Sequence, residues 1–232
     1  MRPWYIKNPE LLAAEQEALS IYQPMLKLQV FQTGTAITSK YSLNRSLAVT
    51  KGIFRLSIPK TQRLIPYQIS IMHPDDYPSS PPIMYCDDVK LPYILDRHIM
   101  DDGQACLAIP SELSKRWREA PWLVPFLENL VAPFLVWQFC YDATGQPPSW
   151  GGRAHGKPGI LRYYADILGL PLSDNIEAFI PFIARKHEPK GHERCPCGSG
   201  KRLRSCHREN LQMARQRLAP QYAKADQKVL NK

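Results

Sequence analysis

Four prolines within nine residues divide this chain into two parts of different character. They stand at positions 74, 78, 81 and 82, in the segment HPDDYPSSPP. Because proline locks φ and lacks a backbone N–H, neither a regular helix nor a central strand crosses such a segment. We expect a rigid extended connection here, compatible with a cis bond before one of the prolines. Strand-forming segments precede it and helical patterns follow it, which predicts an α+β fold.

Local signals before the prolines predict one helix and then a sheet. Asn8 is a suitable N-cap, Pro9 occupies the first helical position, and Pro24 ends the helix. Most of the following segments alternate apolar and polar residues, which is typical of an antiparallel meander with one face in water. Lys51-Gly52 is predicted to be one of the turns between strands. The expected strands are residues 26–32, 47–50, 53–58, 67–72 and 83–86.

Helical patterns dominate after the prolines. Apolar residues recur at helical spacing over 122–138, where Pro133 predicts a kink or a break. Pro158 opens a second helix over 159–168, and a third runs from about 173 to 186. No stretch is expected to match the roughly 18 apolar residues of a membrane span, and the N-terminus lacks a signal-peptide pattern. We therefore expect a cytoplasmic protein with no membrane partner.

The positive charge is confined to the end of the chain. Residues 1–181 carry 17 Lys/Arg and 17 Asp/Glu, whereas residues 182–232 carry 13 and 4, which accounts for the whole net charge of +9. An evenly basic protein is therefore excluded. Because no aromatic residues interleave with the basic ones, we expect an acidic protein surface as the partner of this tail and not a nucleic acid.

Cys106 stands directly after a glycine turn and before an apolar pair, in DDGQACLAIP. A thiol at such a junction between loop and core is accessible enough to act as a nucleophile. A small core residue is the alternative, since most lone cysteines are buried. The surrounding motifs favour the nucleophile.

Those motifs resemble the ubiquitin-conjugating enzymes. They are HPDDYPSSPPIMYC, RHIMDDGQACLAIP, Trp117 and the long apolar helix, and they cover residues 5 to about 140. That family has an N-terminal helix, a four-stranded antiparallel meander, a YPxxPP turn, a cysteine after a glycine turn, a Trp and a core helix, in this order. The resemblance implies a ubiquitin-conjugating-like (UBC-like) fold, in which Cys106 carries a protein C-terminus as a thioester.

Three further positions near Cys106 are candidates for the chemistry. Eukaryotic members carry an Asn eight residues before the cysteine, which steadies the loop and the oxyanion, and here that position is His98. Since an imidazole also donates a hydrogen bond, His98 is either catalytic or loop-ordering, or else a solvated histidine. Asp101 and Asp102 either orient the incoming lysine or form a solvated turn. His155, in a Gly-rich loop, either folds over the site or lies in solvent at the start of a helix.

With histidine in place of this Asn, at position 98, the chain resembles the bacterial branch of the family. Its members sit in small operons, several of them antiphage (CBASS-type) operons with a cyclic-nucleotide synthase resembling cGAS. The resemblance implies that the acyl donor is the C-terminus of a ubiquitin-like protein or of that nucleotidyltransferase. No adenylation domain fits in 232 residues, so an activating enzyme acts in trans or is bypassed.

Four candidate metal ligands crowd into ERCPCGSGKRLRSCH: Cys195, Cys197, Cys206 and His207. Three thiolates and one imidazole suit tetrahedral zinc, whereas a Cys-x-Cys disulfide is strained and disfavoured in a reducing compartment. The string resembles the SEC-C motif, CxCxSGxxxxxC[CH], of the bacterial preprotein translocase ATPase, which implies bound zinc and a partner such as an acidic chaperone. A module of about 20 residues is too small to fold on apolar burial, so zinc is expected to supply its folding free energy.

The expected organisation has three parts. Residues 1–186 form the UBC-like catalytic domain with a helical extension, 187–210 the zinc knuckle, and 211–232 a basic helical or disordered tail. Two other functions remain open beside the thioester enzyme. One is a catalytically silent UBC-fold scaffold, and the other is a SEC-C adaptor whose body presents the knuckle to a partner.

Overall fold

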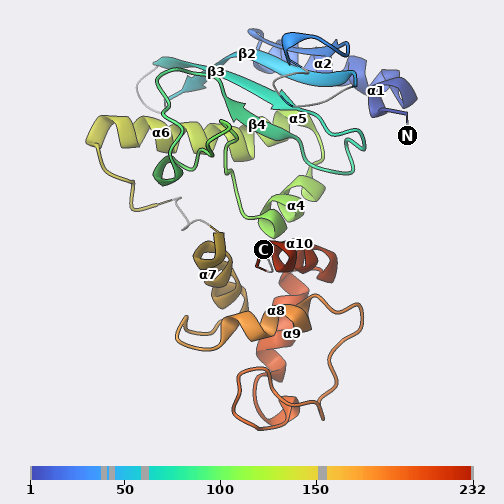
Figure 1. Cartoon of the computed structure of the whole chain (residues 1–232), viewed down its shortest axis with the longest axis vertical. Helices are drawn as coiled ribbons and strands as arrows, with labels where there is room; N and C mark the ends of the chain where they lie inside the picture. Colours follow the sequence, from blue (N-terminus) through green and yellow to red (C-terminus); the bar gives the residue numbers. More distant parts are fainter. Residues whose placement is uncertain (1, 38–40, 42–44, 59–62, 151–155, 231–232) are drawn as a thin grey trace. The chain divides into compact units, whose positions relative to one another are not determined.

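The computed structural model describes residues 2–37, 41, 45–58, 63–150 and 156–230 (Figure 1). The chain divides into two compact units, one of residues Met1–Leu107 and Arg116–Gly152 and the other of Ala108–Lys115 and Arg153–Lys232. The helical extension, which we expected to belong with the catalytic domain, thus shares a unit with the Cys/His cluster and the tail.

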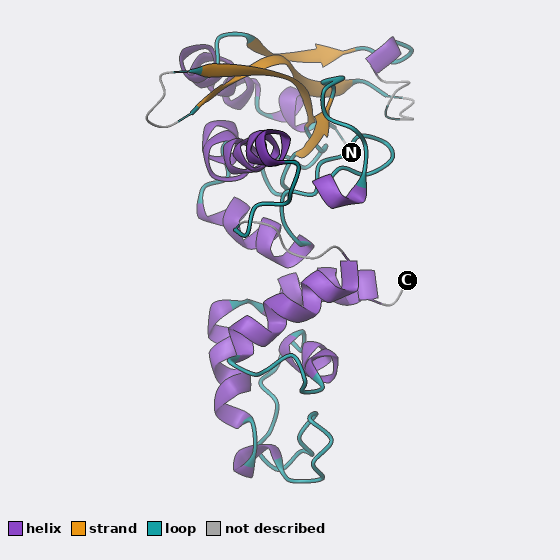
Figure 2. Cartoon of the chain, turned by 90° about the vertical axis from the view of Figure 1, so that its left-hand side faces the viewer, coloured by secondary structure: helices purple, strands orange, loops and turns teal. Residues whose placement is uncertain are grey.

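A sheet of four antiparallel strands organises the first unit. The strands follow the order β1-β2-β3-β4 and are β1 (Leu26–Phe31), β2 (Leu47–Ser57), β3 (Leu64–Met72) and β4 (Ile83–Cys86). Buried Leu26 and Leu28 alternate with exposed Lys27 and Gln29 in β1, so one face of this strand meets the core. A long helical segment lies against one face of the sheet (Figures 1 and 2). The α+β class with a four-stranded antiparallel sheet is confirmed.

The turn expected at Lys51-Gly52 is wrong, because β2 runs through both residues as one strand. Gly52 faces Leu26 of β1 and Ile69 of β3 in the register of the sheet. A Cβ atom at Gly52 would lie 2.1 Å from the carbonyl oxygen of Met25, and the residue has φ +141°. The glycine therefore serves a close approach of two backbones and does not mark a reversal of the chain.

The N-terminal helix forms as its capping signals predict. After α1 (Trp4–Lys7), helix α2 (Pro9–Tyr22) has Pro9 in its first turn, and the side chain of Asn8 accepts a hydrogen bond of 3.0 Å from the N–H of Leu11. This bond satisfies one of the free donors at the helix start. Helix α2 packs beside β1 and α5.

The long apolar helix is continuous, although Pro133 predicts a kink or a break. It consists of α5 (Leu123–Phe126), a π turn η2 (Leu127–Val131) and α6 (Ala132–Thr144). The N–H of Ala132 donates to the carbonyl of Leu127, five residues back. Because Pro133 has no N–H to donate to the residue four positions earlier, the widened turn absorbs the missing bond without ending the helix.

This helix also corrects our expectation about membrane spans. Among the described residues, the helix Leu123–Thr144 has 22 residues and contains an 18-residue window with a mean hydropathy of 1.4, which is long and apolar enough to cross a membrane, and half of that window is buried within the protein. The core helix of a globular protein meets the same criteria, so this is weak evidence for a membrane span.

Aromatic rings hold the proline-rich segment onto the first unit. Its Tyr77-Pro78 peptide bond is cis. The ring of Tyr77 lies 4.7 Å from that of Trp4 and 5.4 Å from that of Trp117, centroid to centroid. Trp117 comes from α4 (Pro110–Glu119), and its indole N–H donates to the carbonyl of Pro78 at 2.7 Å. The packed ring pairs fix a segment that is not extended as we expected, because the N–H groups of Tyr77 and Ser79 close turns on the carbonyls of Pro74 and Asp76.

A buried carboxylate joins three elements in the same region. Glu15 of α2 is 1 % exposed and accepts hydrogen bonds from the Tyr77 hydroxyl and, at 3.1 Å, from the Leu123 N–H at the start of α5. Burial raises the pKa of Glu15, and the two hydrogen bonds oppose the rise. The folded protein therefore holds this proton more tightly than the unfolded chain does.

This linkage gives a pH-dependent prediction. The stability that Glu15 contributes is fully present below its unfolded pKa and is lost as the pH rises through its folded pKa. Glu15→Gln should therefore flatten the dependence of the unfolding free energy on pH between about 4 and 7. Glu15→Ala should cost about 1–3 kcal/mol by leaving two donors unpaired. Urea titrations at the two ends of this pH range measure the unfolding free energy of each variant. If it changes with pH in Glu15→Gln as much as in the wild type, the prediction is contradicted.

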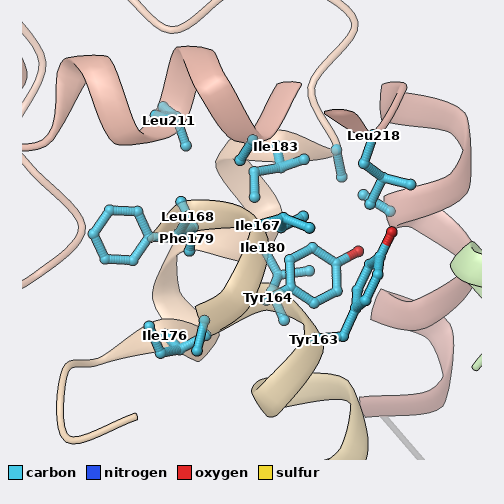
Figure 3. Packing of buried hydrophobic residues seen from close by; sticks show 14 of the residues in the cluster. Tyr163, Tyr164, Ile167, Leu168, Ile176, Phe179, Ile180, Ile183, Leu211 and Leu218 are labelled. Atoms are coloured by element: carbon cyan, nitrogen blue, oxygen red, sulfur yellow. The ribbon is translucent and has the colours of Figure 1, made fainter. Parts of the chain in front are cut away.

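Helices build the second unit around one apolar core (Figure 3). They are α7 (Gly156–Leu168), the 3₁₀ turn η3 (Ile176–Phe179), α8 (Ile180–Ile183), the 3₁₀ turn η4 (Leu203–Ser205), α9 (Arg208–Arg217) and α10 (Pro220–Leu230). The helix expected to reach residue 186 is thus shorter and begins as a 3₁₀ turn. The tail forms two helices, separated just before Pro220.

Part of the positive charge of α9 is used inside this unit. The guanidinium of Arg215 donates to the carbonyls of Phe182, Ile183 and Arg185 at 2.7–3.1 Å. Asn210 donates to the carbonyl of Leu168, the last residue of α7, at 3.0 Å. The last carbonyls of a helix have no partner within it, so these side chains cap α7 and the end of α8. Part of the basic tail therefore stabilises the fold of its own unit.

Candidate functional site

Cys106 ends a small hairpin that begins at His98. The Cys106 N–H donates to the His98 carbonyl at 2.8 Å, and Ile99 pairs with Ala105. Gly103, with φ +84°, closes the turn by donating its N–H to the carbonyl of Met100 at 2.8 Å. The two residues singled out as catalytic candidates, eight positions apart in the sequence, are thereby brought side by side.

The second half of the hairpin is attached to the sheet. Ala105 donates its N–H to the carbonyl of Met84, and Cys86 donates to the carbonyl of Gly103, at 2.9 and 2.8 Å. A Cβ at Gly103 would lie 2.8 Å from the ring of Tyr93, whose hydroxyl in turn donates to the Cys86 carbonyl at 2.6 Å. Strand β4 and Tyr93 thus support the segment leading to Cys106 from two directions.

The environment of Cys106 is neither fully buried nor open. Its side chain is partly exposed, which keeps the sulfur accessible. Burial raises the pKa of its thiol above the ordinary value. A smaller fraction of the thiol is ionised at neutral pH as a result, but the thiolate that does form is a stronger nucleophile.

Two other candidates around Cys106, Asp101 and Asp102, lie in the turn of its hairpin. The carboxylate of Asp102 accepts a hydrogen bond of 2.9 Å from the N–H of Gln104, which is a local turn contact. His155 lies outside the described residues.

A group of side chains that could hold a metal ion lies in the second unit. The ligand atoms of Cys195, Cys197, Cys206 and His207 all lie within 4.8 Å of one another. A hairpin carries the first two, since Arg194 pairs with Arg202 and Cys195 donates its N–H to the carbonyl of Lys201 at 2.9 Å. Cys206 follows η4, and His207 directly precedes α9.

The separations fit a tetrahedral ion. Cys197 Sγ and Cys206 Sγ are 3.6 Å apart, and His207 Nδ1 lies 3.4 Å from Cys195 Sγ and 3.3 Å from Cys206 Sγ. Zinc with bonds of about 2.3 Å to sulfur and about 2.0 Å to nitrogen places S···S pairs about 3.8 Å and S···N pairs about 3.5 Å apart. Nδ1 is therefore the imidazole atom that faces the site.

Ser199 is a neighbour of the metal ligands that the motif's ligand spacing did not single out. Its Oγ accepts a hydrogen bond of 3.1 Å from the Cys197 thiol and lies 3.4 Å from Cys206 Sγ, and its hydroxyl becomes a donor to these sulfurs once they are thiolates. Partial desolvation opposes ionisation of Cys197, but the hydrogen bonds with Ser199, Cys195 and Cys206 together outweigh it, and the pKa of this thiol falls to about 6. Such contacts orient ligands and favour their deprotonated form.

The cluster is built into the core of its unit and is not an independent module. Cys195 and Leu203, 5 % and 1 % exposed, belong to the same apolar cluster as α7, α8 and α9. The ring of Phe179 stands edge-on to the His207 imidazole, with centroids 5.5 Å apart. Apolar burial therefore supports this region together with whatever a metal contributes.

No protein-family model, no curated protein and no solved structure matches the chain. The α+β class with its antiparallel sheet and the Cys/His group therefore stand on the structure alone.

Proposed function

We propose that the chain is a ubiquitin-conjugating-like acyltransferase of UBC-like fold that carries a protein C-terminus as a thioester on Cys106. The observation that carries this proposal is the backbone hydrogen bond of 2.8 Å from the Cys106 N–H to the His98 carbonyl, which closes a hairpin attached to β4. The order of elements supports it: an N-terminal helix, four antiparallel strands, the cysteine, Trp117 and a long core helix.

The proposed reaction has two steps. The Cys106 thiolate attacks the carbonyl carbon of a donor thioester, the new C–S bond forms, and the donor's thiol leaves with a proton from solvent. A lysine amine of the target then attacks the same carbon, loses a proton to solvent, and displaces Cys106. In both steps the His98 imidazole is proposed to stabilise the oxyanion by donating a hydrogen bond. The enzyme contributes mainly positioning.

The raised pKa of the Cys106 thiol suits a carrier. Burial is the cause of the rise. Thiolates of higher pKa are poorer leaving groups, so a thioester on Cys106 resists adventitious hydrolysis until an amine is positioned. The same rise means that charging should accelerate as the pH increases toward the pKa of the thiol.

The second unit is proposed to bind structural zinc through its four ligands and to recruit an acidic partner. Lys201, Arg202 and Arg204 are exposed in and beside the metal-binding hairpin, where they give the surface a positive potential. A cytoplasmic role in antiphage defence is part of the proposal. The donor there is a ubiquitin-like protein or a nucleotidyltransferase resembling cGAS, with an activating enzyme acting in trans or none.

A transfer assay on the full chain tests the function. A ubiquitin-like protein carrying a small-thiol thioester at its C-terminus is mixed with the protein, and the adduct is mapped by peptide mass spectrometry. We expect one adduct, on Cys106, that dithiothreitol cleaves. No adduct with this donor or with the C-terminal thioester of a nucleotidyltransferase resembling cGAS would favour the scaffold or adaptor instead. An adduct on Cys140 would contradict the role of Cys106 by placing the nucleophile elsewhere.

A further inference from the structure

His98 adopts a backbone conformation that histidine rarely takes. With φ 57° and ψ 33° it is left-handed, and it is the only non-glycine residue with positive φ among the residues that the structure describes. Such a conformation costs about 1–2 kcal/mol for a residue with a Cβ atom. Surrounding contacts must therefore hold His98 in place.

The preceding residue, Arg97, provides that hold. It ends the 3₁₀ turn η1 (Leu95–Arg97) and is 9 % exposed. Its carbonyl accepts a hydrogen bond of 2.6 Å from Gln138 Nε2, and its guanidinium lies 2.5 Å from the carboxylate of Asp142. The guanidinium carbon also stands 4.3 Å from the ring centre of Tyr141. Both ends of Arg97 are thus fixed, and a peptide bond joins Arg97 directly to His98.

The partners of these two residues lie on one face of α6. Trp137, Gln138, Tyr141 and Asp142 are spaced so that they follow one side of a helix. Trp137 meets the His98 ring edge-on, with centroids 5.2 Å apart. The helix ends just beyond them at Gly145, whose φ is +67°. This face of α6 therefore contacts both His98, the first residue of the hairpin, and Arg97, which precedes it.

We infer that the last turns of α6 position the Cys106 nucleophile, with Gln138 and Asp142 acting through Arg97 and the strained His98. This inference rests on the proposed function, which makes Cys106 a nucleophile, and its geometry comes from the contacts described above. His98 in turn holds the Cys106 N–H through its carbonyl. Neither Gln138 nor Asp142 touches the sulfur, so both are positioning residues.

Two substitutions test this without a donor protein. Gln138→Met keeps length but loses the donor to the Arg97 carbonyl, and Asp142→Asn keeps size but loses the charge. Glu128→Gln is the matched control, because Glu128 is an exposed carboxylate elsewhere on the same long helix. The readouts are iodoacetamide modification of Cys106 between pH 7 and 10, followed by peptide mass spectrometry, and hydrogen exchange of the Cys106 amide.

Release of the hairpin should expose the thiol. We expect alkylation of Cys106 to become about threefold to tenfold faster at pH 8, with its apparent pKa nearer the ordinary value. Amide exchange should become at least about tenfold faster. Asp142→Glu, which keeps the carboxylate, should show the wild-type rates of alkylation and exchange. Transfer from the thioester donor should fall about tenfold in Gln138→Met and Asp142→Asn. A variant that merely lost stability would not change the thiol pKa in the folded protein.

Wild-type alkylation and exchange in both Gln138→Met and Asp142→Asn would overturn the positioning role, whatever the transfer assay shows. If alkylation and exchange change in the two variants but the wild type accepts no acyl group, the positioning of Cys106 by α6 is supported. Only the proposed function is then contradicted. The two failures are therefore distinguishable.

Discussion

Serine in place of Cys206 should abolish binding of the proposed zinc ion and destabilise the unit of residues Ala108–Lys115 and Arg153–Lys232. Zinc bound through three thiolates and an imidazole contributes folding free energy directly, because the site does not exist in the unfolded chain. Part of the stability comes from the apolar core, so we expect a loss of about 3–5 kcal/mol and not complete unfolding.

Metal analysis of the reduced protein and urea unfolding followed by circular dichroism measure these effects. Cys140→Ser is the control, since Cys140 lies on α6 in the other unit and outside the ligand group. That variant should keep one zinc ion per chain and unfold the second unit at the wild-type urea concentration. Wild-type protein that binds no zinc after reduction and dialysis against a zinc buffer would contradict the metal centre.

The integration of the ligands into the core explains why the expected loss has an upper limit. Leu203 lies between two ligand pairs in the sequence and is 1 % exposed in the cluster that includes Leu211 and Phe179 (Figure 3). A free-standing knuckle would have no such support. The local motif predicts a separate module, but the Phe179 ring beside His207 comes from η3 and the buried Leu211 comes from α9, on either side of the motif.

Local signals were predictable wherever one short motif determines the structure. Asn8 and Pro9 specify the start of α2 through capping alone, and the Cys/His string specifies its own cluster. Gly52 was misread because the contact that requires glycine, with the Met25 carbonyl, is made by a distant backbone. Composition within a short window does not distinguish such a contact from a turn.

The positioning contacts of the candidate site were not predictable for the same reason. Arg97 stands next to His98 in the sequence, but Gln138 and Asp142 lie more than forty residues from Arg97, at and beyond the end of the helix predicted over 122–138. The left-handed conformation of His98 was not predictable either, since histidine is enriched there but adopts other conformations far more often. Only the fold brings these groups together.

Alanine in place of Cys106 should abolish the acyl adduct, and serine should trap it. Cys106→Ala has no nucleophile, so no mass increase is expected with any donor. Cys106→Ser should form an oxyester that dithiothreitol does not cleave. Its transfer to lysine should be at least about 100-fold slower, about 3 kcal/mol of barrier, because an alkoxide is a much poorer leaving group than a thiolate.

These two variants separate the thioester enzyme from the silent scaffold, because they alter one atom of a partly exposed side chain and leave the packing almost unchanged. Equal thermal unfolding of Cys106→Ser and wild type serves as the control for folding. His98→Ala should retain the adduct but slow its transfer to an amine by about 10²–10³, the usual cost of losing one oxyanion donor. Transfer that survives in Cys106→Ala would place the nucleophile elsewhere. An unchanged rate in His98→Ala would leave His98 only its backbone role of holding the Cys106 N–H.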